Sequence, residues 1–178
     1  AFEAAIAVAM DAASNVYALI AYSGSLDLGS AACPALAVTP ASYGLAVVKL
    51  AAADGACLGQ TLLVPSKATW VNLDSWKPGS IAVNASGVVA VTGAVVTSGV
   101  DTDVLVARID GTNVWQKVFA SPTTNDAGQA VALNAAGDVF VTGYFRESLD
   151  ITSPALTEPG GHALFVARLA ASNGATLW

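Results

Sequence analysis

A strand–turn–strand pattern occurs three times in this chain, and it constrains the fold more than any other feature. The copies are AVAMDAASNVYALIAY from Ala7, SIAVNASGVVAVTGAV from Ser80 and AVALNAAGDVFVTGYF from Ala130. In each copy, apolar and small residues alternate on both sides of a polar turn rich in Asn, Asp, Ser or Gly. These turn residues tolerate left-handed backbone and hydrogen-bond to their own turns, so each copy predicts a β-hairpin.

A second block follows each hairpin and supplies two further strands. It reads YGLAVVKL from Tyr43, DVLVARI from Asp103 and HALFVARL from His162. Each block leads into a tight-turn pair and then another strand; the pairs are Asp54-Gly55, Asp110-Gly111 and Asn173-Gly174. The blocks are apolar on both faces, which is typical of strands in a sheet covered on both sides. We therefore expect four antiparallel strands in each repeat.

Four antiparallel strands recurring about every 50 to 70 residues are typical of β-propeller blades. We predict an all-β chain with almost no helix, forming one propeller segment over residues 1–178. Its parts are repeat 1 (about 4–64), a connecting insertion (65–78), repeat 2 (about 79–125) and repeat 3 (about 126–178).

Three blades are too few for a closed propeller, because each sheet needs a neighbour on both faces. Leaving two apolar faces in water costs roughly 25 cal/mol per Å². We therefore expect an incomplete ring. The remaining blades belong either to a longer chain, which the unfinished last strand at Trp178 favours, or to a second copy that completes six blades.

Composition limits the classes of partner. The chain is 54% hydrophobic and 11% charged, yet no apolar run approaches the roughly 18 residues of a membrane-spanning helix. A net charge of −6 opposes binding to nucleic acid. The single histidine, His162, is not accompanied by a nucleophile motif, which argues against a catalytic triad. Asp103 and Asp110 lie at opposite ends of one predicted strand, too far apart to bind one metal ion. We expect no catalytic residues, no metal, no cofactor, no nucleic-acid partner and no membrane insertion.

The unit GDVFVTGYF … LTEPGGHALFVARLAASNGATLW resembles the SBBP-type β-propeller repeat of bacterial surface and secreted proteins. The resemblance runs from about Ala7 to Trp178, although repeat 2 lacks the middle connection and repeat 1 has Leu19-Ile20 where repeat 3 has Thr142-Gly143. It implies a shared architecture without shared catalytic residues. We expect a non-enzymatic scaffold or protein-interaction module, exported to the bacterial surface or beyond.

The alternative function is carbohydrate binding by the insertion. There, the segment TWVNLDSW places Trp70 and Trp76 around Asn72 and Asp74. Tryptophan rings beside polar side chains are suited to stacking on a sugar. The same tryptophans would equally serve to cover the edge of a sheet, because aromatic residues bury more often than they bind. The predicted partner is accordingly a protein or a glycan.

Two sets of residues occupy matching places in the repeats. Lys49, Arg108 and Arg168 lie near the end of the second block. We expect them to form either a ring of positive charge for an acidic ligand or separate cations that extend to water over buried stems. Trp115 and Trp178 lie in the last strand of repeats 2 and 3, where we expect them to pack between blades.

The two cysteines, Cys33 and Cys57, both belong to repeat 1. The matching residues of repeat 3, Ser153 and Thr176, lack both thiols together, which predicts a disulfide and an oxidising compartment. The connection that holds Cys33 must then run back along the blade, so that the α-carbons lie within about 7 Å. Two buried free thiols are the alternative.

Overall fold

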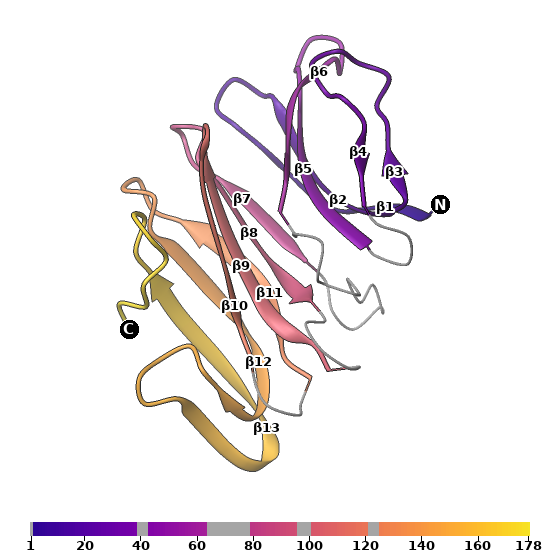
Figure 1. Cartoon of the computed structure of the whole chain (residues 1–178). Coiled ribbons are helices and arrows are strands. Elements are labelled where there is room, and N and C mark those ends of the chain that lie inside the picture. The colour runs from indigo at the N-terminus through magenta and orange to yellow at the C-terminus, as the bar shows by residue number, and fades with distance from the viewer. Residues whose placement is uncertain (1, 39–42, 64–78, 96–100, 121–124) are drawn as a thin grey trace.

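The computed structural model describes residues 2–38, 43–63, 79–95, 101–120 and 125–178 (Figure 1). All regular secondary structure in these residues is β-strand, and every strand pairing is antiparallel. The predicted all-β class is therefore confirmed. No helix in the described ranges is long and apolar enough to cross a membrane.

The first sheet has four strands and carries a small hairpin in its middle connection. Its order is β1 (Phe2–Met10), β2 (Val16–Ser23), β5 (Tyr43–Leu50) and β6 (Cys57–Leu62). The hairpin pairs β3 (Ser25–Leu26) with β4 (Leu36–Ala37). The second sheet also has four strands, β7 (Ser80–Val83), β8 (Val89–Val95), β9 (Asp103–Asp110) and β10 (Asn113–Phe119).

The third sheet corrects the prediction of four strands in every repeat. It contains three, β11 (Ala127–Leu133), β12 (Val139–Leu149) and β13 (Leu156–Leu169). The segment expected to be its fourth strand makes an isolated bridge between Leu169 and Thr176 and three backbone hydrogen bonds, two between Arg168 and residues 177–178 and one from the Ala170 N–H to the Ala175 carbonyl. These contacts involve too few residues to make a ladder, so this segment is an edge pairing rather than a strand.

The predicted hairpin turns are held by their own polar side chains. The Asp11 carboxylate accepts backbone N–H groups from Ala13 and Asn15 at 3.0 and 2.9 Å. Asn84 and Asn134 perform the same role in the second and third sheets. The residue that takes a positive φ is Ser14, Gly87 or Gly137 in the three turns, with φ of 64°, 80° and 84°.

The three larger sheets are stacked face to face in chain order (Figure 1). One apolar core lies between the first and second sheets, and we call this contact the first interface. Another core lies between the second and third sheets, at the second interface. The first strands of the repeats also pack together, β1 on β7 and β7 on β11.

Each sheet has a forward face, which is turned toward the next sheet in chain order, and a rear face. Cross-strand pairing places equivalent residues in the same rows. Forward-face residues from the β5, β9 and β13 strands are Leu45 and Val47, Val104 and Val106, and Leu164 and Val166. Rear-face residues from these strands are Ala46 and Val48, Leu105 and Ala107, and Phe165 and Ala167. At both interfaces, a forward face meets the rear face of the next sheet.

The rear face of the first sheet is partly covered by the chain itself. Leu26 of the β3–β4 hairpin packs against Tyr22 and Val48 on this face. A disulfide joins Cys33 to Cys57, with the α-carbons 6.2 Å apart. The connection that holds Cys33 therefore does run back along the sheet.

Candidate functional site

The residues of the alternative carbohydrate site, Trp70, Asn72, Asp74 and Trp76, lie outside the described residues. His162 lies on β13, where its ring is 6.1 Å from that of Tyr144. Within the described ranges, no group of three or more His, Cys, Asp or Glu side chains is placed to hold a metal ion. The candidate sites that the structure provides are instead at the two interfaces and on the free forward face of the third sheet.

The three equivalent cations each have a carboxylate partner. Lys49 lies 3.3 Å from Asp11, and Arg168 lies 2.6 Å from Asp138. Arg108 pairs with Asp110 at 3.0 Å. Pairing within the protein agrees with the second sequence interpretation, in which each cation is a separate strand-end residue, rather than with a ring of free positive charge.

The turn of the first hairpin forms a small electrostatic network with Lys49. The Asn15 side-chain amide is the main cause that lowers the pKa of Asp11 to about 2, and the Asn15 backbone N–H and Lys49 add to it against partial burial. The Tyr17 hydroxyl and then the Asp11 carboxylate raise the pKa of Lys49. The Lys49 ammonium lies 5.0 Å from the centre of the Tyr17 ring. Lys49 is therefore a fixed cation held above an aromatic face.

At the second interface, Trp115 and Arg108 both reach across to the third repeat. They are cross-strand partners on β10 and β9. The indole Nε1 of Trp115 donates a hydrogen bond of 2.9 Å to the Ala171 carbonyl. Arg108 Nε donates one of 3.0 Å to the Gly137 carbonyl. These two bonds anchor the rim of the second interface.

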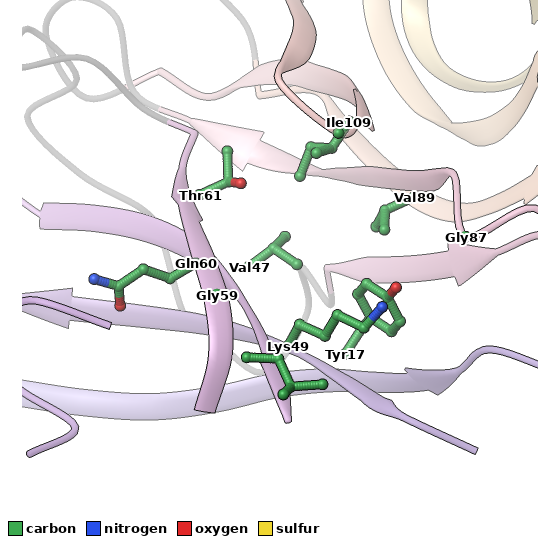
Figure 2. A pocket seen from close by; sticks show the side chains of 11 residues that line it. Tyr17, Val47, Lys49, Gly59, Gln60, Thr61, Gly87, Val89 and Ile109 are labelled. Atoms are coloured by element: carbon green, nitrogen blue, oxygen red, sulfur yellow. The ribbon is translucent and has the colours of Figure 1, made fainter. Parts of the chain in front are cut away.

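At the first interface, the cross-strand partner of Lys49 is Gly59 on β6, so a glycine stands where the second sheet has Trp115. A cavity of about 360 Å³ opens beside Gly59, between the first and second sheets. Figure 2 shows Tyr17, Val47 and Lys49 on one side of it and Val89 and Ile109 on the other. The first interface is therefore hollow where the second is filled.

The forward face of the third sheet is uncovered in the described structure. Leu164 and Val166 are 78% and 55% exposed, whereas their equivalents Val104 and Val106 in the second sheet are completely buried. Trp178 lies on the same face, with its ring 6.1 Å from that of Phe140. As predicted, Trp115 packs between two sheets, whereas Trp178, for which the same packing was predicted, is 55% exposed and has no sheet over it in the described part of the chain.

The role of Gly59 was missed by the sequence reasoning, although a signal was present. Aligning Cys57-Leu58-Gly59 with Thr176-Leu177-Trp178 puts the glycine in a tryptophan position. The two backbone hydrogen bonds around Arg168 show that Trp178 occupies this same place in the third repeat. Comparison of the chain with protein-family models finds no match, and neither does a search of curated proteins.

Proposed function

We propose that this chain is a non-enzymatic scaffold of the β-propeller type, and that the free forward face of its third sheet is an interaction surface for a further sheet of the same kind. The exposure of Leu164 and Val166 carries this proposal. The same row is buried at both existing interfaces, where Leu45 and Val47 are 3% and 5% exposed. An apolar row that is covered twice and open once indicates a missing neighbour.

The occupant proposed for this face is the rear face of the first sheet in a second copy of the chain. Forward faces bind rear faces at both interfaces, so a copy carries the complementary surface. On the first sheet's rear face, Val8 and Met10 are 66% and 64% exposed. Their equivalents in the third sheet, Val131 and Leu133, pack into the core of the second interface. Head-to-tail pairing of two copies buries these residues as well.

The β3–β4 hairpin is compatible with such pairing. In the third repeat, Leu149 at the end of β12 and Ile151 in the connection after it contribute to the core of the second interface, together with residues of the second sheet. At the second interface, the connection of the third repeat and the second sheet therefore both pack on the rear face of the third sheet. We expect Leu26 to behave in the same way in the dimer.

Sedimentation equilibrium tests this function. We expect the wild-type chain to form dimers, or longer head-to-tail assemblies if the ring does not close, and the double variant Leu164→Asp, Val166→Asp to be monomeric. Val118→Asp is the control, because Val118 is also exposed, at 42%, but lies on β10. A wild-type chain that stays a folded monomer at every concentration would contradict the proposal.

The setting proposed for this scaffold is the bacterial surface or the extracellular medium. The disulfide between Cys33 and Cys57 supports an oxidising compartment, since such bonds are rare in the cytosol. The resemblance to SBBP-type repeats supports the same setting and the same architecture.

A further inference from the structure

The first interface lacks a side chain that the second interface uses. Gly59 and Trp115 hold the same register position, each opposite the cation near the end of the neighbouring strand. A Cβ built on Gly59 would meet no atom within 4 Å. The backbone there is not in the left-handed region, so glycine is not required by the conformation. The glycine leaves space rather than serving a turn.

Trp115 shows which group suits this position. Its indole lies against the turn of the third repeat, so that a Cβ on Gly174 would be only 2.8 Å from the ring. Its one polar atom is satisfied, because Nε1 donates to the Ala171 carbonyl at 2.9 Å. The position therefore accepts a planar aromatic group with one N–H donor at its edge.

The cavity at the first interface offers a separate molecule surroundings that resemble those of the Trp115 indole. Its volume of about 360 Å³ falls within the range of roughly 300–1,000 Å³ typical of small-molecule sites. Val47, Val89 and Ile109 provide apolar contacts from both sheets. Gly111 also lines the cavity, and it follows Ile109 by two residues as Ala171 follows Leu169. By sequence alignment, Gly111 is the counterpart of Ala171, whose carbonyl accepts from Trp115, although the turn at Gly111 has two residues (111–112) and the turn at Ala171 has four (171–174).

Lys49 adds a preference for aromatic groups over aliphatic ones. Its ammonium is held by Asp11 at 3.3 Å and lies over the Tyr17 ring, while its side chain lines the cavity. A cation fixed in this way attracts the face of a π system. An aliphatic ligand would gain the apolar contacts but not this attraction.

We propose that the cavity between the first and second sheets binds the indole group of a ligand, in the place that the Trp115 indole fills at the second interface. The planar ring packs between Val47 and Ile109, and its N–H donates to the Gly111 carbonyl. This site is independent of the interaction surface on the third sheet.

Isothermal titration calorimetry with three probes tests the chemistry of the ligand. Indole is expected to bind saturably at one site per chain. Benzofuran has the same shape without the N–H, and we expect it to bind roughly two- to tenfold more weakly. N-acetyl-tryptophanamide separates the two sources of an indole group. Binding as tight as that of indole indicates the tryptophan side chain of a peptide, and much weaker binding indicates a free small molecule.

Variants test the location. Gly59→Trp fills the cavity from the protein itself, so indole binding should be lost. Leu62→Trp is the matched control, because it adds the same ring to β6 at an exposed residue that does not line the cavity, and binding should remain. Trp115→Gly should create a second indole site in the same chain. No saturable binding to the wild type, or unchanged binding to a folded Gly59→Trp variant, would overturn the proposal.

Discussion

The two interfaces between neighbouring sheets share faces and register but differ at the rim. At the second interface, Trp115 and Arg108 both donate hydrogen bonds to backbone carbonyls of the third repeat. At the first interface, Gly59 stands in the tryptophan position, and Lys49 turns back to Asp11 of its own repeat. Two residue differences, tryptophan against glycine and arginine against lysine, thus distinguish a filled rim that is hydrogen-bonded to the next repeat from a hollow rim.

This difference shows that, in a repeat architecture, different residues determine the stacking of the sheets and the contacts at the rim of each interface. The buried rows in the middle of each strand set the stacking of the sheets, and they are apolar at both interfaces. The rim residues change without altering that stacking. Because each sheet packs mainly on its neighbours in the stack, the strength of one interface can change while the next stays the same. Four predictions test the comparison, beginning with the largest expected effect.

Replacing Trp115 with alanine should destabilise the protein by about 3 kcal/mol. The change removes the indole from the second interface together with its hydrogen bond to Ala171. The free energy of unfolding, obtained from guanidinium titration, measures the loss. A cost below about 1 kcal/mol would mean that the indole does not anchor this interface.

Replacing the equivalent cations Arg108 and Lys49 with alanine should lower the free energy of unfolding by unequal amounts. Arg108→Ala removes a charged donor to the Gly137 carbonyl from a residue that is only 7% exposed, and the expected cost is about 2 kcal/mol. Lys49→Ala removes a half-buried ion pair within one repeat, and we expect a cost below about 1 kcal/mol. Equal costs, in the same guanidinium titrations, would contradict the difference between the two rims.

Adding a single methyl group at Gly59 should stabilise the protein slightly. Gly59→Ala introduces a Cβ into open space and restricts the unfolded chain, with an expected gain of about 0.4–1 kcal/mol. Thermal unfolding followed by circular dichroism measures the change. As a control, Gly128→Ala should lower the melting temperature, because a Cβ there would overlap the buried Thr92 hydroxyl. A lower melting temperature for Gly59→Ala would show that the cavity wall is already close-packed.

The smallest effect concerns the pH dependence of the Asp11 network. The pKa of Asp11 is lowered from 3.8 to about 2 in the folded protein, chiefly by the Asn15 side chain, so folding favours the ionised carboxylate. Its contribution to stability is present above pH 3.8 and is lost as the pH falls through about 2. The difference in urea midpoint between wild type and Asp11→Asn should therefore shrink over this range. A difference that stays constant down to pH 2 would contradict the assignment.

Local features of the fold could be predicted from the sequence because they depend on neighbouring residues. Asp11, Asn84 and Asn134 cap their own turns, and period-two alternation forms the hairpins in all three repeats. The pairing of Cys33 and Cys57 could also be proposed from their joint absence in the third repeat. The prediction of a fourth strand in that repeat was wrong. A segment that matches in sequence, such as 175–178, becomes a strand only if it forms a ladder with its neighbour.

The sequence by itself determined the all-β class, the hairpins and the apolar rows, since side-chain period and turn chemistry act over a few residues. Only the tertiary structure decided that forward faces meet rear faces, because both rows of each strand are apolar and either could have been turned to the next sheet. The cavity beside Gly59 depends on the same stacking of a forward face on a rear face. A missing side chain becomes a binding site only where another sheet, here with Val89 and Ile109, closes the space around it.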